Sequence, residues 1–341
     1  MAVMKWSEAF PPTATFTEAN IPDQSGRVFI ITGGTSGCGF ELAKAVYNLN
    51  GRIYIAGRSQ DRVEAAIDKI KSSPAAPHPN VETGKGSLHF LYLDLEDMPT
   101  VKSAADEFMG KEERLDVIWH NAGIMGVPDG SKTKQGFETH IGVNAFAPWL
   151  FQHFLTPLCL RTAARSEVQP FSTRVIWVSS AGHRGSPQPD GVNWDDVAMH
   201  DKKGFMSGVM VKYGQSKAMN VMHAHEFARR YGEKGLLSVS LHPGNLKSNL
   251  TRHQSWLFRA LTNPLLYDAH HGALTELFAG FADAGQEEGR MVEEGGKNGS
   301  FVEPWGRWGT EEGNHVFDGL RERNTGERLW ALCEEWLPDE V

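Results

Sequence analysis

The stretch TGGTSGCG (residues 32–39) decides the fold that we expect of this chain. It directly follows an apolar, β-branched run, RVFIIT (27–32), and helical spacing begins immediately after it. Glycines at such a junction allow a tight turn, bring the backbone close to a pyrophosphate and let the helix lie close to the sheet. The free N–H groups at the helix start then face the phosphates. Alone, such a turn is weak evidence; between a buried strand and a helix, it predicts a dinucleotide site.

The rest of the chain alternates between short apolar runs and segments with helical spacing. We expect strands at 27–32, 52–56, 88–93, 115–120, 174–179 and 238–242, and helices at 40–49, 60–71, 136–160 and 211–231. Alternation of this kind predicts parallel strands joined by helical crossovers. The expected fold class is therefore α/β: a single doubly wound, Rossmann-like domain, whose parallel sheet has helices on both faces, plus a C-terminal extension.

The composition argues against several classes of function. With 34 Lys and Arg against 42 Asp and Glu, the net charge is −8, and no basic run indicates a nucleic-acid partner. Three scattered cysteines and the histidines lack the spacing of metal ligands, which predicts reduced thiols and no metal site. No stretch approaches the ~18 apolar residues of a membrane helix, and the N-terminus lacks the apolar core of a signal peptide. We expect a cytoplasmic protein without a transmembrane segment.

The end of the second expected strand indicates which dinucleotide binds. An NAD site usually places a carboxylate ~20 residues after the glycines, where it accepts from the ribose 2′-hydroxyl. Here that place is taken by Arg58, and the first carboxylate after it is Asp61. A guanidinium pairs with a 2′-phosphate, so Arg58 favours NADP(H). The alternative is a solvated arginine at a helix start.

Two further clusters fall at the ends of expected strands, where ligands of parallel sheets bind. Asp94-Leu95 closes the third strand, and its carboxylate is placed to contact an adenine ring. Asn121-Ala122-Gly123 closes the fourth, where small residues allow a ribose to lie against the backbone. Each cluster is common by chance, and only their position makes them informative.

Tyr213 and Lys217 are the candidate catalytic pair. Their spacing places both side chains on one face of a helix. A neighbouring ammonium lowers the pKa of a tyrosine from its ordinary value near ~10, toward the range useful for acid–base work. Such pairs are frequent on protein surfaces, so the pair gains meaning from its companions. These are Ser179-Ser180 at the end of the fifth strand and Asn144 within an apolar helix.

Taken together, the motifs resemble the short-chain dehydrogenase/reductase family. The stretches that match, covering residues 26–250 in the family's order, are TGGTSGCG (32–39), DL (94–95), NAG (121–123), VNAFAP (143–148), VSSAG (178–182), YGQSK (213–217) and HPGNLKS (242–248). Arg58, HxxVN at 140–144 and the long interval from Ser180 to Tyr213 are most similar to retinol-dehydrogenase-type and fungal NADP-dependent members. Ala147-Pro148 and Ser248 depart from the usual pattern, which leaves the catalytic groups intact.

The resemblance implies a role for each matching residue. Tyr213 would be the acid/base, Lys217 would lower its pKa and hold the nicotinamide ribose, Ser180 would orient the substrate oxygen, and Asn144 would support the proton relay. The cofactor contacts implied by the residues and by the family together are Gly33, Thr35, Ser36, Gly37, Cys38, Gly39, Arg58, Asp94, Leu95, Asn121, Ala122, Gly123, Tyr213, Lys217, Pro243, Gly244, Leu246 and Ser248.

These roles predict an NADP(H)-dependent oxidoreductase that transfers hydride between the nicotinamide and a carbonyl or alcohol of an apolar small molecule, with reduction favoured. One alternative is a family member recruited for epimerisation or for reduction-coupled cyclisation of a natural product. Another is a non-catalytic NADPH-binding interaction protein. The intact Ser180, Tyr213 and Lys217 set favours ordinary redox turnover.

We expect three parts in the chain: an N-terminal arm (1–25), the NADP-binding catalytic domain (26–300) and a Trp-rich extension packed on it (301–341). Within the domain, 182–208 and 249–281 are expected to shape the substrate pocket. The apolar stretch 249–267 fits a lid, a patch resting on a membrane surface or plain packing against the sheet. A homodimer and peripheral membrane contact both stay open.

Overall fold

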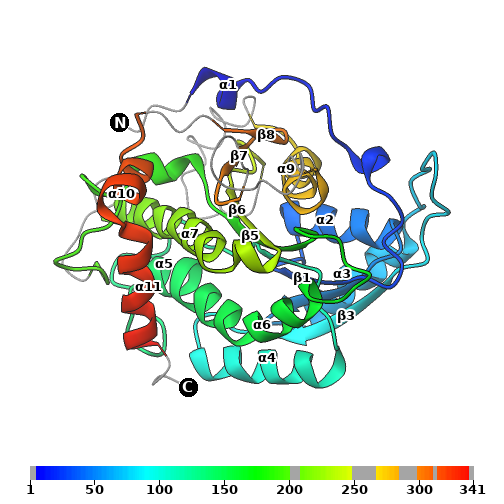
Figure 1. The fold of residues 1–341 in the computed structure, drawn as a ribbon, viewed down its shortest axis with the longest axis horizontal. Coiled ribbons are helices and arrows are strands. Elements are labelled where there is room, and N and C mark those ends of the chain that lie inside the picture. The colour runs from blue at the N-terminus through cyan, green and yellow to red at the C-terminus, as the bar shows by residue number, and fades with distance from the viewer. Residues whose placement is uncertain (1–4, 200–207, 248–265, 284–297, 310–312, 338–341) are drawn as a thin grey trace.

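The computed structural model describes residues 5–199, 208–247, 266–283, 298–309 and 313–337 (Figure 1). Its centre is an eight-stranded sheet in the order β3-β2-β1-β4-β5-β6-β7-β8. The strands through β7 pair in parallel, and β8 pairs antiparallel with β7. Their bounds are β1 (Val28–Thr32), β2 (Arg52–Gly57), β3 (Ser87–Tyr92), β4 (Val117–His120), β5 (Thr173–Val178), β6 (Leu236–Leu241), β7 (Phe301–Glu303) and β8 (Arg307–Trp308).

Helices cover both faces of this sheet, which confirms the expected doubly wound fold. One face carries α2 (Gly37–Asn48), α3 (Gln60–Ser72) and α9 (Ala269–Phe281). The other carries α4 (Met98–Lys111), α6 (Ala147–Ala163) and α7 (Met210–Tyr231). The strands β1, β4, β5 and β6 are buried along their whole length, because apolar helices lie on each side of them.

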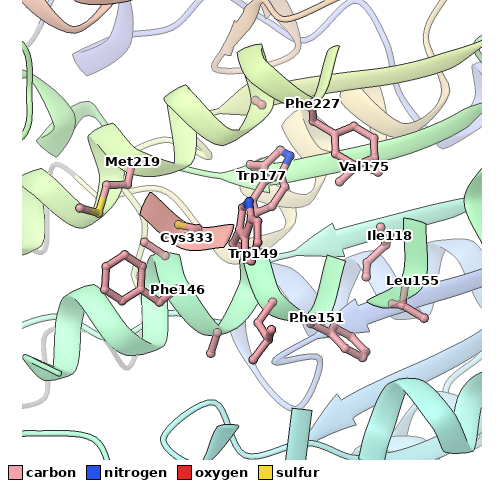
Figure 2. Close-up of a cluster of buried hydrophobic side chains, with 14 of the residues drawn as sticks. Ile118, Phe146, Trp149, Phe151, Leu155, Val175, Trp177, Met219, Phe227 and Cys333 are labelled. Atoms are coloured by element: carbon pink, nitrogen blue, oxygen red, sulfur yellow. The ribbon is translucent and has the colours of Figure 1, made fainter. Parts of the chain in front are cut away.

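Large aromatic side chains fill the layer between the sheet and α6–α7. Figure 2 shows Trp149 of α6 beside Trp177 of β5, with Phe151 of α6 and Phe227 of α7 in the same buried cluster. All four side chains are buried. This close-packed layer holds α7, the helix that carries Tyr213 and Lys217, firmly against the sheet.

Two differences from the sequence prediction fall between β3 and α6. The helix α4 was not expected, although its buried residues Val101, Ala104, Ala105 and Phe108 have helical spacing. The long helix expected from residue 136 begins as α5 (Thr139–Ile141) and then passes through a π-helical turn, η2 (Gly142–Phe146), before α6 starts. This turn contains Asn144, and π-helical turns frequently mark functional positions.

The described residues near each end of the chain, from Lys5 and up to Leu337, lie against the sheet and α7. The short helix α1 (Trp6–Ala9) lies beside β7 and β8, and a turn η1 (Glu18–Asn20) follows it (Figure 1). At the other end α10 (His315–Arg323) and α11 (Thr325–Trp336) contact α7. The boundary expected at residue 300 differs from the structure, because β7 pairs with β6 and belongs to the sheet. Within the described ranges, no helix is both long and apolar enough to cross a membrane.

Candidate active site

A cavity of about 570 Å³ opens at the carboxyl ends of the parallel strands. Its walls bring together the glycine turn after β1, the ends of β2, β3 and β4, and the start of α7. Ligand sites of open α/β sheets lie at this edge, and the volume is in the range of small-molecule pockets. Most of the residues singled out from the sequence therefore share one pocket.

The glycine turn lies so close to the turn after β4 that a side chain at Gly33 or Gly39 has no room. Gly33 has φ +73°, and a Cβ on Gly39 would lie 2.4 Å from Asn121 Nδ2 and 2.9 Å from the Gly33 carbonyl oxygen. Asn121 Nδ2 donates to the Thr32 carbonyl (2.7 Å), and the Ala122 N–H donates to Thr32 Oγ1 (2.9 Å). The turns after β1 and β4 thus form one rigid backbone cradle, which suits a pyrophosphate.

Charged side chains mark the far end of the cavity, where β2 and β3 end. Arg58 Nη1 lies 2.8 Å from Glu96 Oε1, and both side chains are substantially exposed. Arg62, one turn further along α3, also lines the cavity. Sequence reasoning missed Arg62, whose signal was its position four residues after Arg58, at the start of the expected helix 60–71. Asp94 lines the same wall, where its Oδ1 accepts from the Glu96 N–H (3.0 Å).

Tyr213 and Lys217 lie one turn apart on the buried face of α7. The Lys217 ammonium lies 5.9 Å from the centre of the Tyr213 ring and donates to the Val178 carbonyl (2.8 Å). Ser180 caps the short 3-10 helix η3 (Ala181–Gly185), and its Oγ accepts from the Gly182 N–H (3.1 Å). Ser179, by contrast, donates its hydroxyl to the Lys217 carbonyl (2.7 Å). The two serines therefore differ in role: Ser179 holds the backbone of α7, whereas the Ser180 side chain lies at Tyr213.

Burial dominates the acid–base properties of this pair in the protein alone. Removal from water raises the pKa of Tyr213, and a hydrogen bond with the Ser180 side chain lowers it by a smaller amount. Removal from water also lowers the pKa of Lys217 from 10.5 to about 7. The sequence argument expected the ammonium to lower the tyrosine pKa; here the larger effect is desolvation of both groups.

Asn144 ties three elements together beside this pair. Its Oδ1 accepts from the Ile124 N–H (2.8 Å), and its Nδ2 donates to the Ile124 carbonyl (3.0 Å) and to Ser216 Oγ (3.0 Å). A Cβ on Gly123 would lie 3.3 Å from Lys217 Nζ and 3.4 Å from Asn144 Oδ1, so glycine is needed for this close approach. The sequence analysis missed Ser216. Its hydroxyl also donates to the Tyr213 carbonyl, a contact that a serine in any helix can make, so nothing in the sequence set this residue apart.

Part of the cavity lining is apolar. Ile124, Met125, Val143, Met210 and Leu246 form this wall. Leu266, at the edge of the described residues, completes this apolar wall. The expected cofactor contact Ser248 and most of the stretch 249–267 lie outside the described residues, as do residues 200–207 of the other expected pocket segment.

Pro243 and Gly244 form the rim beside this wall. Gly244 has φ +101°, and a Cβ there would lie 2.4 Å from the ring of Trp305. A residue of the C-terminal part thus supports the backbone where the resemblance places the nicotinamide. Within the described ranges, no group of three or more His, Cys, Asp or Glu side chains is arranged to hold a metal ion.

Curated relatives match nearly the whole chain. A family model described as short chain dehydrogenase matches residues 27–188. A short-chain dehydrogenase/reductase of Phomopsis amygdali is 38% identical over 97% of this chain and 95% of its own length. The short-chain dehydrogenase/reductase iacJ of Pestalotiopsis fici is 39% identical over 96% of each chain.

Solved structures share the fold at lower identity. An uncharacterized protein from Mycobacterium paratuberculosis has a TM-score of 0.67 and 24% identity, over 94% of this chain and 97% of that one. The RhlG/NADP active-site complex of Pseudomonas aeruginosa has a TM-score of 0.50 and 22% identity, over 67% of this chain and 76% of that one. These likenesses extend the evidence on the fold.

Proposed function

Because the chain belongs to the short-chain dehydrogenase/reductase family, we propose that it is an NADP(H)-dependent oxidoreductase that reduces a carbonyl of an apolar small molecule to an alcohol. The observation that carries the proposal is the meeting of Ser180, Tyr213 and Lys217 in the cavity that the glycine turn also lines. The apolar wall around Met125 and Met210 supports an apolar substrate.

The backbone cradle fits a dinucleotide, since Gly33 and Gly37 line the cavity with no side chain between their backbone and a ligand. The turn 32–39 would hold the pyrophosphate, Arg58 and Arg62 the 2′-phosphate, and Asp94 and Leu95 the adenine end. Lys217 would hold the nicotinamide ribose. When bound, the cofactor supplies the hydride.

The protein's part in the reaction is a proton transfer. The raised pKa of Tyr213 keeps its hydroxyl protonated at neutral pH, so it can donate a proton to the carbonyl oxygen as negative charge develops there. Ser180 Oγ, hydrogen-bonded with Tyr213, would hold the same oxygen in place. Lys217 and Asn144 lie behind the tyrosine, on the path by which its proton would be replaced.

Replacement of Tyr213 tests the proposed chemistry. NADPH consumption is first screened across aldehydes, steroids, retinoids and polyketide-like ketones. We expect Tyr213→Phe to lower kcat on a substrate found in this way by about 10²–10⁴-fold, with the Kd for NADPH unchanged, because only the proton donor is lost. Tyr92→Phe, at an exposed tyrosine, is the matched control. Unchanged activity in Tyr213→Phe would refute the proposal, and tight NADPH binding without turnover on any carbonyl would favour a non-catalytic binding protein.

Replacement of Arg58 tests the cofactor preference. We expect Arg58→Ala to lower the ratio of NADPH to NADH affinity by about 10–100-fold, the loss of a charge-assisted hydrogen bond to phosphate. Glu96→Gln should raise NADPH affinity, since Glu96 competes for the same guanidinium. Both constants are measured by fluorescence titration, with Arg165→Ala as a remote control. An unaltered ratio in Arg58→Ala would remove the basis for NADP(H).

We also propose a cytoplasmic location. Its support is the state of the three cysteines, all of which are free thiols, with Cys159 and Cys333 buried. Scattered, unpaired cysteines are typical of a reducing compartment. Fluorescence microscopy of the tagged protein tests the location.

A further inference from the structure

The short helix η3, which Ser180 caps, is held by Glu8 from the N-terminal arm and by Asn314 from the C-terminal extension. It is a five-residue 3-10 helix, and two backbone hydrogen bonds join its ends to the flanking residues: His183 N–H to the Ser180 carbonyl (3.1 Å) and Ser186 N–H to the His183 carbonyl (3.2 Å). Such short 3-10 segments are weak on their own. The position of Ser180 therefore depends on the side chains that tie η3 to the rest of the molecule.

The first tie comes from the N-terminal arm. Glu8 of α1 is fully buried and makes two hydrogen bonds to the Arg184 guanidinium, Nη1 to Oε2 (2.5 Å) and Nη2 to Oε1 (2.6 Å). Burial by itself would raise the pKa of Glu8, but Arg184 outweighs it and the pKa lies below the ordinary value. The carboxylate is thus charged and bidentate, the geometry that orients a guanidinium most strongly.

The second tie comes from the C-terminal extension. Asn314 caps α10, with its Oδ1 accepting from the Val316 N–H (3.1 Å), so its Nδ2 is the donor to His183 Nε2 (2.7 Å). Since Nε2 accepts, the ring proton of His183 is assigned to Nδ1, which donates to the Ser180 carbonyl (2.6 Å). Burial lowers the pKa of His183 to about 3, so the ring stays neutral. A chain of hydrogen bonds therefore runs from Asn314 to the backbone of Ser180.

We propose that Glu8 and Asn314 are positioning residues for Ser180, so that both chain ends set the geometry of the active site. The inference rests on the proposed function for its effect on turnover. A Cβ on Gly182 would lie 3.4 Å from Ser180 Oγ and 2.9 Å from Tyr213 Cε1, which shows how closely η3 adjoins the reacting groups. Small displacements of such groups cost large factors in rate.

A double-mutant cycle tests the proposal. Glu8→Gln keeps the size of the side chain but removes its charge, and Asn314→Ser keeps a helix cap but is too short to reach His183. We expect each to lower kcat about 10-fold and to leave the Kd for NADPH within about twofold. In a Ser180→Ala background, the same substitutions should change kcat by less than about twofold, because the group they position is gone. Equal losses in both backgrounds, or an effect on KM alone, would overturn the proposal.

Two control variants remove other ties of the same chain ends. Lys5→Met removes the ion pair with Glu303, and Arg323→Gln removes the ion pair with Asp190. Neither contact involves η3, so kcat should stay within about twofold of the wild type. If Glu8→Gln does not fold, Glu8→Gln/Arg184→Gln leaves no buried charge and carries the same prediction.

Amide hydrogen exchange gives a readout independent of turnover. We expect the amides of residues 181–186 to exchange about 10-fold faster in Glu8→Gln and Asn314→Ser, and unchanged in the two control variants. Unchanged exchange in the first pair would overturn the proposal. A wild-type protein without carbonyl turnover would instead refute the proposed function, and the exchange rates would still decide whether the chain ends hold η3.

Discussion

The two sides of the cavity are built in different ways. On the nucleotide side, the turn after β1 closes onto the turn after β4 through backbone groups and two side chains, Thr32 and Asn121. On the catalytic side, Ser180 follows β5 and Tyr213 lies on α7, while the ties that hold η3 span 176 residues to Glu8 and 131 residues from His183 to Asn314. A compact cradle made by neighbouring turns therefore faces a site assembled from distant parts of the chain.

The two sides of the cavity should therefore respond differently to substitutions. On the proposed nucleotide side, the turns after β1 and β4 are in close contact at Gly33 and Gly39, so larger residues there should fail by steric clash. The catalytic side depends on the alignment of Ser180 with Tyr213, so substitutions there should lower kcat before they weaken NADPH binding. Substitutions at glycines on the two sides separate these outcomes.

The largest effect is expected for Gly39→Ala. Its Cβ would lie 2.4 Å from Asn121 Nδ2 and 2.9 Å from the Gly33 carbonyl oxygen, so the cradle must open. We expect NADPH affinity to fall by about 100-fold or more, the cost of distorting a well-packed turn. Fluorescence titration measures it. Gly110→Ala, where a Cβ would meet nothing within 4 Å, is the matched control. Retained affinity in Gly39→Ala would show that the cradle is not rigid.

Gly182→Ala should act on rate instead. Its Cβ would lie 2.9 Å from Tyr213 Cε1, which forces the ring or η3 to move. We expect kcat to fall by about 100-fold while the Kd for NADPH stays within about twofold. Stopped-flow single-turnover kinetics beside the titration checks both. A parallel loss of NADPH affinity would mean that the two sides are not separable.

Each side also buries a titratable group, and Lys217 is the one on the catalytic side. Its pKa in the folded protein is about 7, below the value of 10.5 expected when the chain unfolds. Between these values the unfolded state binds more protons, so stability should rise with pH by up to about 1.4 kcal/mol per pH unit. Lys217→Met should remove this slope between pH 7 and 9 in urea denaturation, while the exposed-site variant Lys102→Met should keep it. If the free energy of unfolding changes with pH equally in the wild type and in Lys217→Met, burial does not lower the pKa of Lys217.

Glu276 of α9 is the corresponding group behind the nucleotide side, and its effect should have the opposite sign. Burial raises its pKa from 4.5 to about 8, and neither carboxylate oxygen has a hydrogen-bond partner among the residues that the structure describes. The folded protein holds this proton longer than the unfolded chain, so stability should fall as pH rises from about 5 to 7, again by up to about 1.4 kcal/mol per unit. Urea denaturation of Glu276→Gln should show a flatter profile, with Glu233→Gln as control. An unchanged slope would indicate that the carboxyl finds a partner.

Much of the fold was predictable from the sequence because its signals are local. The apolar runs of β1, β2 and β5 are each only five or six residues long, and the glycines follow β1 directly. The missed helix α4 carried the same periodic signal in Val101, Ala104 and Phe108, diluted by charged neighbours. Among site residues, Tyr213, Lys217, Ser180 and Asn144 were singled out by type and spacing, and the structure brings them together at one cavity or beside it.

The remaining parts of the site had no local signal. The sequence around Glu8 contains nothing that points to Arg184, and Asn314 resembles any helix cap. The separate roles of Ser179 and Ser180 also depend on which hydroxyl meets the Lys217 carbonyl. The same holds for the burial that moves the pKa values of Tyr213 and Lys217.

The sequence by itself predicted the alternation of strands and helices through β6 (α4 apart), the proposed dinucleotide turn at 32–39 and the proposed acid–base pair. Backbone propensity, glycine geometry and helical spacing act over a few residues, so they can be recognised directly in the sequence. Only the tertiary structure decided that β7 extends the sheet and that both chain ends hold the helix that begins at Ser180. Desolvation and long-range hydrogen bonds arise only when distant segments pack together. No local sequence pattern therefore predicts them.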